Sequence, residues 1–156
     1  MNSRMTKKIA ILNYGLGNIR SVNNALVANG AVPIITDQEH EIMSADGLIV
    51  PGVGAFPRAM EYLELTGLDD VIRRYVNSGK GILGICLGMQ ILFENGHEYE
   101  PTDGLSLIPG NVCKISTELN KVRLPHIKWS HVDLHEHSDL MFSNITMGTR
   151  FYFVHS

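Results

Sequence analysis

Short apolar runs that alternate with helical stretches are the feature that most restricts how this chain can fold. The strand-like runs cover residues 8–12, 31–36, 47–50 and 81–85. Apolar residues at helical spacing lie between them, in residues 19–29, 60–65 and 69–77. Because strands separated by helices are joined by right-handed crossovers, the pattern predicts an α/β fold with a mostly parallel, flavodoxin-like sheet flanked by helices. Gly30 stands where the first helix would end, and Pro33 predicts an edge position for the second strand.

After Gly96 the sequence changes character, because strand-like runs follow one another with little helix between them. These runs cover residues 112–116, 122–124, 131–134 and 151–154. We expect them to form an antiparallel extension over the same core. The chain has no internal repeat and no low-complexity linker, so residues 1–156 are predicted to form a single domain.

Composition excludes several classes of function. The formal net charge is −3 and the pI is about 6.1, which argues against a nucleic-acid binder with a basic surface. No apolar run approaches the roughly 18 residues that a membrane span needs. The two cysteines, Cys86 and Cys113, stand in a chain without secretory features, so a reduced, cytoplasmic protein is expected.

The most informative segment is Gly84-Ile85-Cys86-Leu87-Gly88, in which glycines flank a cysteine at two positions on either side. It follows a predicted strand and precedes the apolar-periodic run LGMQILFE, which predicts a helix from Leu87 to Glu94. A nucleophile on such a sharp strand-to-helix turn lies at the carboxyl edge of a parallel sheet, where ligands bind. The start of a helix favours the thiolate, and the Leu87 N–H would point at a developing oxyanion. We therefore prefer a nucleophilic Cys86 over a buried strand cysteine.

Two other glycine-containing segments and the second cysteine are the remaining candidates for a functional site. Pro51-Gly52-Val53-Gly54 ends the third strand at the same sheet edge and can present backbone N–H groups to an anion. Gly15-Leu16-Gly17 precedes a helix, but position 20 is an arginine, so a dinucleotide-binding loop is disfavoured. Cys113 has no glycine turn and no helix after it, and we interpret it as a structural cysteine.

With these segments the chain resembles the class I, triad-type glutamine amidotransferases, and among them the glutaminase subunit of imidazole glycerol phosphate synthase in histidine biosynthesis. The matching stretches are ILNYGLGNIRSV, IVPGVGAF, GILGICLGMQILFE, LPHIKW and FYFVHS, spread over nearly all of the chain. Relatives that feed anthranilate or aminodeoxychorismate synthesis show PGPG and CLGHQ, where this chain has PGVGAF and CLGMQ.

The resemblance implies roles for individual residues. Cys86 would attack the side-chain amide of L-glutamine, release ammonia and leave a glutamyl thioester that water cleaves. Leu87 and the Gly52–Val53 turn would supply oxyanion N–H groups, the turn after a peptide flip. Gln90 and Ser156 would hold the amino-acid end of glutamine. The positions that match the surface facing a cyclase (β/α)8-barrel partner are Asn13, Asn18 and Trp129. Ammonia would pass through that partner in a heterodimer, with no cofactor, metal, nucleic acid or membrane involved.

Two departures from the family pattern stand out. The usual PHxGW motif is replaced by one with Lys128 in place of glycine, which leaves open a paralogue in a surface-polysaccharide pathway. The family's catalytic histidine and glutamate lie in a His-Pro-Glu stretch beyond FVHS, and no residue of this chain matches them. We therefore expect a C-terminally incomplete domain and, without a base worth roughly 10²–10⁴-fold in rate, little glutaminase activity.

Other interpretations stay open at this point. A pseudo-glutaminase that binds and regulates a barrel subunit would explain the unmatched histidine and glutamate, although not the intact cysteine turn. A redox sensor or another cysteine hydrolase on a flavodoxin-like fold is disfavoured by PGVGAF and CLGMQ. The alternation in HVDLHEH, residues 131–137, would place three histidines and Asp133 on one strand face, where an exposed polar face is a commoner explanation than a metal site. His126 and His155 match family segments but not the base.

Overall fold

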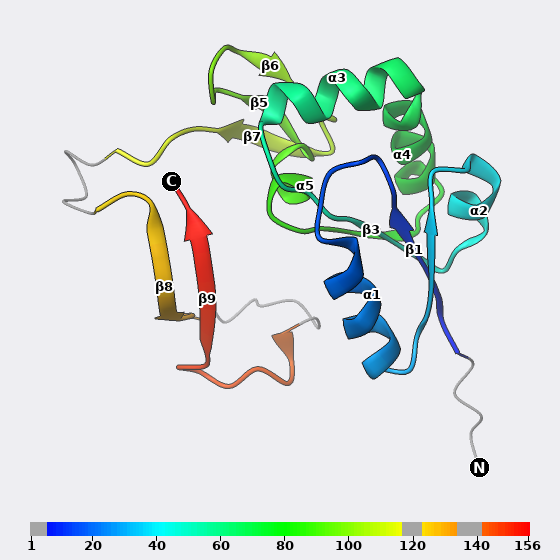
Figure 1. The fold of residues 1–156 in the computed structure, drawn as a ribbon, viewed down its shortest axis with the longest axis horizontal. Coiled ribbons are helices and arrows are strands. Elements are labelled where there is room, and N and C mark those ends of the chain that lie inside the picture. The colour runs from blue at the N-terminus through cyan, green and yellow to red at the C-terminus, as the bar shows by residue number, and fades with distance from the viewer. Residues whose placement is uncertain (1–5, 117–122, 134–141) are drawn as a thin grey trace. The chain divides into compact units, whose positions relative to one another are not determined.

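The computed structural model describes residues 6–116, 123–133 and 142–156 (Figure 1). Their contacts divide the chain into two compact units, Met1–Cys113 and Lys114–Ser156. Whether the two make up the single predicted domain stays a prediction.

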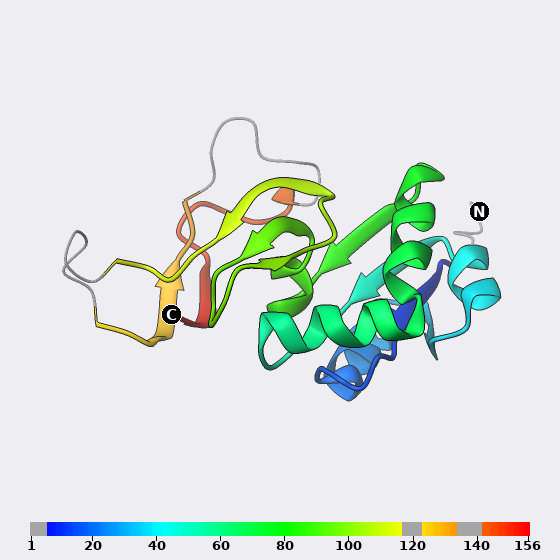
Figure 2. The ribbon, with the colours of Figure 1, turned by 90° about the horizontal axis from the view of Figure 1, so that it is seen from above.

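The first unit is built on a parallel sheet of four strands. These are β1 (Lys8–Leu12), β2 (Val32–Thr36), β3 (Gly47–Val50) and β4 (Gly81–Gly84), in the order β2-β1-β3-β4. Each neighbouring pair is parallel, and Figure 2 shows the arrows of β3 and β4 side by side and pointing the same way. The predicted α/β class and strands are confirmed. Pro33 lies in β2, an outer strand, where a residue without an N–H is tolerated.

Four helices accompany this sheet: α1 (Ile19–Ala28), α2 (Glu39–Ser44), α3 (Phe56–Thr66) and α4 (Leu68–Asn77). Asn18 begins α1, and its side chain accepts a hydrogen bond of 3.3 Å from the Ser21 N–H, as an N-cap does. Gly67 ends α3 with a φ of 72° and lets α4 start at the next residue. The six-residue α2 was not predicted, because its short sequence shows too little apolar periodicity.

The core lies between the sheet and helices α2, α3 and α4, because no residue of α1 is buried. The last three residues of β1 and of β3 are all buried. Consecutive buried residues are expected for strands covered on both faces. The largest fully buried side chains are Tyr14, Tyr75, Phe56, Ile11, Leu12, Ile42, Leu48, Met60, Leu63, Ile72, Leu87 and Ile91. Burial of each apolar side chain of this size contributes about 1.5–3 kcal/mol relative to exposure, so this cluster provides the main driving force for folding the first unit.

The segment after the cysteine turn corrects one prediction. The helix α5 covers only Leu87–Gln90, and the chain then forms β5 (Phe93–Gly96) instead of continuing as a helix to Glu94. β5 pairs with β6 (Thr102–Asp103) in antiparallel and with β7 (Ile108–Val112) in parallel orientation. Tertiary pairing overrides the local helical pattern here, since β5 gains ladder hydrogen bonds on both sides.

The predicted strand at residues 112–116 is wrong, because pairing with a distant strand sets where this strand begins and ends. β7 ends at Val112, where the strand was predicted to begin, because its pairing partner β5 ends at Gly96 opposite Val112. The second half is therefore only partly antiparallel.

The second unit contains an antiparallel strand pair, β8 (His126–His131) and β9 (Arg150–His155). The predicted strand at residues 151–154 is confirmed. The strands predicted at 122–124 and 131–134 are wrong where they are described: Arg123 and Leu124 are outside any strand, and only His131 belongs to β8. Pairing with β9 sets the position of β8, from His126 opposite His155 to His131 opposite Arg150. Val122 and Leu134 lie outside the described residues.

Candidate active site

Cys86 stands on a strained turn between β4 and α5. Its φ is 57° and its ψ is −119°, and among the described residues only Ser106 is another non-glycine with a positive φ. Such a conformation costs of the order of 1–3 kcal/mol and persists only where the surroundings enforce it. The Met89 and Gln90 N–H groups both donate to the Cys86 carbonyl, at 2.9 and 3.1 Å, so the turn leads directly into α5. The thiol itself is exposed to solvent.

Glycines allow the turn to pack against the end of β3. A Cβ on Gly84 would lie 2.4 Å from the Met89 Cα, and a Cβ on Gly88 would lie 1.8 Å from the Val50 carbonyl oxygen. The Ile85 N–H donates to that same Val50 carbonyl at 2.9 Å. The two glycines of the G-x-C-x-G pattern are therefore required by close backbone approach.

The loop Pro51–Gly54 follows β3 and touches the Cys86 turn. A Cβ on Gly52 would lie 2.5 Å from the Gly88 nitrogen and 2.8 Å from the Leu87 Cβ, so the two segments are in direct backbone contact. Val53 is 53% exposed, and Gly54 has a φ of 116° with open space around it. The loop is thus fixed at Gly52 and has room to move beyond it.

The Leu87 N–H is a free donor beside the thiol. Within the described residues it donates no hydrogen bond to the protein, while the Leu87 side chain is buried in the core. A backbone donor without a protein partner is what an oxyanion site requires, and the role of Leu87 in such a site stays a prediction. α5 contributes a single turn of helix, and any field at its N-terminus is correspondingly local.

Tyr14 is a component of the site that the sequence analysis missed. It follows β1 at the same sheet edge, is fully buried, and its hydroxyl donates a hydrogen bond of 2.6 Å to the Pro51 carbonyl oxygen. Burial raises the pKa of the Tyr14 hydroxyl well above its ordinary value, and the nearby charge of a Cys86 thiolate raises it further. A tyrosine two residues after the first strand was the available signal, since parallel strands bring their carboxyl ends together.

The second anchor of the loop was also missed. The Glu98 carboxylate accepts a hydrogen bond of 2.8 Å from the Phe56 N–H at the start of α3. It satisfies one of the four N–H groups that every helix leaves without an intrahelical partner. The Pro51–Gly54 loop is therefore held before Gly52 by Tyr14 and after Gly54 by Glu98.

Comparison with known proteins agrees with this geometry. A model of the CobB/CobQ-like glutamine amidotransferase domain matches residues 5–139. The chain belongs to the glutamine amidotransferase family. Imidazole glycerol phosphate synthase subunit HisH of Bacillus cytotoxicus is 43% identical over 95% of this chain and 69% of its own length. The HisH subunit of Bacillus cereus strain G9842 is 44% identical over the same shares. The predicted family is confirmed.

A solved structure supports the fold of this amidotransferase. The crystal structure of a glutamine amidotransferase aligns with a TM-score of 0.62 over 94% of this chain and 70% of that chain, at 17% identity. At this identity the likeness shows the α/β architecture and no more.

The remaining predicted site residues of the amidotransferase fall in both units. Gln90 is the last residue of α5, half-buried and four positions after Cys86. Asn13 is exposed, and its N–H donates to the Thr36 carbonyl at 2.9 Å, while Asn18 is the exposed N-cap of α1. Trp129 and Ser156 belong to the second unit, in β8 and directly after β9. Their roles stay predictions.

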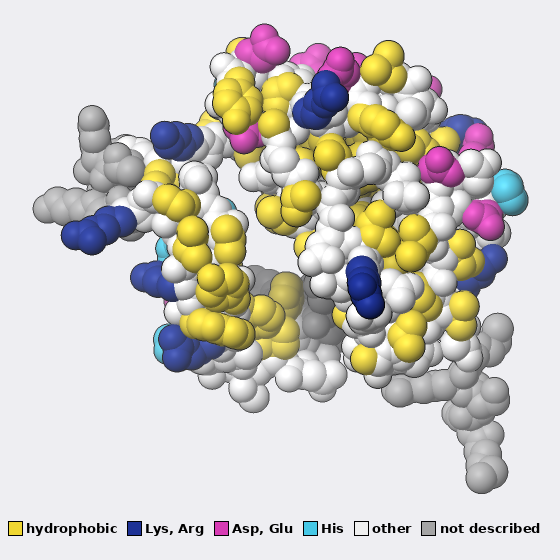
Figure 3. All heavy atoms as spheres, in the orientation of Figure 1, with side chains coloured by type: hydrophobic (Ala, Val, Ile, Leu, Met, Phe, Trp, Pro, Cys, Tyr) yellow, Lys and Arg dark blue, Asp and Glu magenta, His cyan; other side chains and the backbone are white. Residues whose placement is uncertain are grey.

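One face of the β8–β9 pair is apolar and exposed. Ile127 pairs with Val154 and Trp129 pairs with Tyr152, and these four side chains are 52–58% exposed (Figure 3). Lys128 lies opposite Phe153 on the other face. An exposed apolar face of this kind is typical of an interaction surface.

Cys113 is exposed rather than part of the core, and both cysteines are free thiols. No group of three or more possible metal ligands gathers within residues 6–116, 123–133 and 142–156. His135 and His137 of the HVDLHEH pattern lie outside the described residues. In the same three ranges, no helix is long and apolar enough to cross a bilayer.

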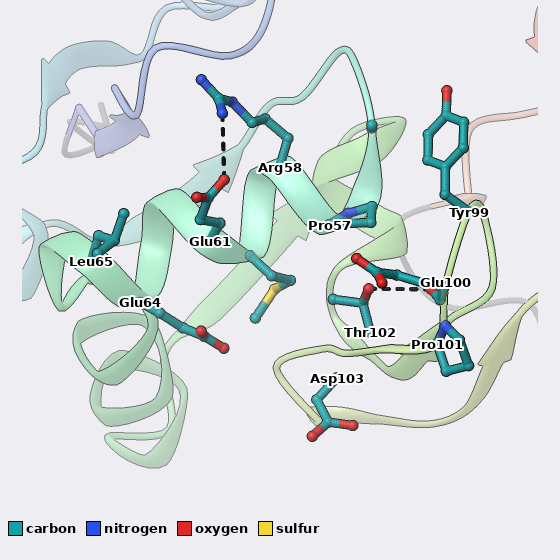
Figure 4. A pocket seen from close by; sticks show the side chains of 12 residues that line it. Pro57, Arg58, Glu61, Glu64, Leu65, Tyr99, Glu100, Pro101, Thr102 and Asp103 are labelled. Atoms are coloured by element: carbon teal, nitrogen blue, oxygen red, sulfur yellow. Dashed lines mark hydrogen bonds and ion pairs between the residues drawn. The ribbon is translucent and has the colours of Figure 1, made fainter.

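A hollow of about 980 Å³ lies beside α3 rather than at the thiol. α3 and the segment 99–103 line it, and four of the lining side chains are carboxylates: Glu61, Glu64, Glu100 and Asp103 (Figure 4). Arg58 forms an ion pair with Glu61 at its edge, which leaves an excess of negative charge. Its lining does not include Cys86, and the chemistry of the site does not depend on this hollow.

Proposed function

We propose that this chain is the glutaminase subunit of an imidazole glycerol phosphate synthase. Cys86 attacks the side-chain amide carbon of L-glutamine, and the tetrahedral oxyanion collapses with cleavage of the C–N bond. The amide nitrogen takes up a proton and leaves as ammonia, while the glutamyl group remains as a thioester. Water cleaves the thioester, so that glutamate is released and the thiol is restored.

The conformation of Cys86 is the observation that carries this proposal. A φ of 57° in a non-glycine residue, enforced by two glycines in close backbone contact, aims an exposed thiol at the carboxyl edge of the sheet. A merely structural cysteine has no need of this strain. The Leu87 N–H and the adjoining Gly52–Val53 peptide are the proposed oxyanion donors, and the loop's open space at Gly54 permits the peptide flip.

The proposal extends to substrate, partner and compartment. Gln90 and Ser156 would bind the amino-acid end of glutamine. A (β/α)8-barrel cyclase would receive ammonia across a surface that includes Asn13, Asn18 and Trp129, and the apolar face around Trp129 supports such an interface. Free exposed thiols support a reducing, cytoplasmic location. No observation favours the surface-polysaccharide paralogue over the histidine pathway.

The test uses a chloroketone analogue of glutamine, because alkylation of Cys86 requires a glutamine pocket but no general base. We expect saturable labelling of Cys86, identified by peptide mass spectrometry, and protection by L-glutamine but not by D-glutamine. Cys113 is the internal control, since it is also an exposed free thiol and should react slowly and without protection. Equal labelling of both cysteines, or labelling of Cys86 that glutamine leaves unchanged, contradicts the proposal.

Turnover of glutamine tests whether a cyclase partner activates the chain. Glutamate release from glutamine is measured with and without the cyclase subunit. The rate should be low, because no residue matches the family's catalytic histidine and glutamate, and stimulation of that low rate by the cyclase subunit is the expected result. Saturable Cys86 labelling without any partner-stimulated turnover would instead support the pseudo-glutaminase interpretation.

A further inference from the structure

We propose that Tyr14 is a positioning residue of the glutaminase site, which holds the Pro51–Gly54 loop in register with Cys86 through the Pro51 carbonyl. The inference rests on the proposed function, because the loop must present N–H groups to the oxyanion for its register to matter. Tyr14 itself would touch no substrate.

The Tyr14 hydroxyl lies where the loop meets the cysteine turn. It donates to the Pro51 carbonyl oxygen at 2.6 Å, and it lies 2.8 Å from the position of a Cβ on Gly52. That same position is 2.5 Å from the Gly88 nitrogen and 2.8 Å from the Leu87 Cβ. The hydroxyl thus holds the loop directly, at the point where Gly52 meets the cysteine turn.

The hydrogen bond fixes one peptide plane and leaves the next one free. The peptide group is planar and trans, so holding the Pro51 oxygen also fixes the direction of the Gly52 N–H. Gly17 also packs against this peptide, since a Cβ on Gly17 would lie 3.0 Å from the Pro51 Cβ and 3.3 Å from the Gly52 nitrogen. The Gly52–Val53 peptide follows, with an exposed Val53 and a glycine at 54. Tyr14 therefore provides a fixed base about which the next peptide rotates.

The hydroxyl remains a donor throughout the working pH range. Burial raises the pKa of Tyr14, and negative charge on Cys86 raises it further, so formation of the thiolate does not ionise the tyrosine. The bond to Pro51 is accordingly present in the state of the enzyme that attacks.

A purely structural role predicts a different result, and Tyr75 supplies the comparison. Tyr75 is also fully buried, and its hydroxyl also donates to a backbone carbonyl, that of Ala45 at 3.3 Å in α4's packing against the core. Tyr14→Phe and Tyr75→Phe each remove one buried hydroxyl and leave one carbonyl without that donor. Only the first removes it beside the proposed site.

The experiment separates transition-state geometry from thiol reactivity. We measure the maximal rate and half-saturation of Cys86 alkylation by the glutamine chloroketone, together with the rate of alkylation by iodoacetamide, which needs no pocket. In Tyr14→Phe we expect the maximal chloroketone rate to fall roughly 10-fold, because a misplacement near 1 Å at a reacting site can cost up to about 10²-fold. Half-saturation and the iodoacetamide rate should stay within about 2-fold. Tyr75→Phe should leave all three values unchanged.

A second pair of variants keeps the tyrosine in place. Gly15 and Gly17 both have positive φ, of 79° and 129°, so alanine adds backbone strain at each. A Cβ on Gly17 would press on Pro51, whereas a Cβ on Gly15 has nothing within 4 Å. We expect Gly17→Ala to lower the maximal chloroketone rate and Gly15→Ala to leave it unchanged.

The outcomes distinguish failure of the proposed function from failure of the positioning role of Tyr14. If the unaltered protein shows no saturable labelling, the proposed function fails. If it is labelled and Tyr14→Phe is labelled at the same maximal rate, only the positioning role of Tyr14 is overturned. Equal losses in the chloroketone and iodoacetamide rates would also overturn it, since the thiol and not the loop would then have changed.

Discussion

Gly88 lies so close to Val50 that a Cβ on Gly88 would stand 1.8 Å from the Val50 carbonyl oxygen. This contact joins the second residue of α5 to the last residue of β3, from which the Pro51–Gly54 loop departs. The position of Cys86 relative to that loop is therefore set by backbone contact rather than by adjustable side chains.

Gly88→Ala should abolish stable folding of the first unit. The added methyl group would meet backbone atoms of β3, which cannot move without breaking the sheet, and overpacking normally costs about 1–3 kcal/mol even where side chains can yield. We expect a loss above about 3 kcal/mol in the free energy of unfolding, measured by urea denaturation followed by circular dichroism. Gly81→Ala is the control, because a Cβ on Gly81 has nothing within 4 Å, although that residue lies in strand β4 of the same unit. Comparable losses in the two variants would contradict the packing argument.

Cys86→Gly should be more stable than the parent chain although it has lost the thiol proposed as the nucleophile. Glycine adopts a positive φ without the strain of about 1–3 kcal/mol that a side chain carries there. Its greater freedom in the unfolded chain costs about 0.5–1 kcal/mol. We expect a net gain of about 0.5–2 kcal/mol in urea denaturation, whereas Cys86→Ala keeps its Cβ and should show no such gain.

Cys113→Gly is the matched control for this prediction. Cys113 is not among the described residues with positive φ, so glycine should there bring only the entropic loss of about 0.5–1 kcal/mol. A Cys86→Gly variant that is destabilised as much as Cys113→Gly would show that the turn carries no strain.

The sequence alone predicted those helices and strands whose local residue pattern agrees with their packing in the fold. β1, β3 and the start of β4 were predicted because apolar runs between glycine-containing turns have few other stable solutions, and Cys86 was found from its flanking glycines. β5 was missed because LGMQILFE has helical periodicity and only the pairing with β6 and β7 makes Phe93–Gly96 a strand. Such pairing depends on residues distant in sequence.

The supporting residues of the site could not be predicted for a related reason. Tyr14 and Glu98 act on backbone atoms of Pro51 and Phe56, which lie 37 and 42 positions away in the chain. No short motif records such a contact. Flanking glycines single out Cys86 as the candidate nucleophile, while the residues that orient its surroundings are found only in the fold.

Glu98→Ala should loosen the start of α3 and with it the end of the Pro51–Gly54 loop. It removes the acceptor of the Phe56 N–H, and loss of a helix cap costs about 0.5–2 kcal/mol. Urea denaturation should show that loss, while Glu98→Gln keeps an acceptor oxygen and should retain most of the stability. Glu100→Ala, which removes an exposed carboxylate from the same segment, is the control and should stay within about 0.5 kcal/mol of the parent. If Glu98→Ala leaves the free energy of unfolding unchanged, the hydrogen bond from the Phe56 N–H to Glu98 does not stabilise α3 in solution.

Lys128 should govern the titration of His126 on β8. Partial burial lowers the pKa of His126 below its ordinary value of about 6.5, and the positive charges of Lys128 and His155 lower it further. Lys128→Met should therefore raise the pKa of His126 part of the way back, because burial and His155 remain. Arg150→Gln removes a cation from the same strand pair that does not contribute to the shift, and should leave the pKa of His126 unchanged.

The same shift gives the stability of the second unit a defined pH dependence. Between pH 6.5 and the lower pKa of the folded state, the unfolded chain binds a proton at His126 that the folded chain does not. The free energy of unfolding should thus be highest above pH 6.5 and decrease as the pH falls through that window. NMR titration of the His126 ring and urea denaturation at a series of pH values measure the two quantities. In Lys128→Met the decrease should be smaller, and a decrease of the same size with an unshifted His126 would show that Lys128 does not act on this histidine.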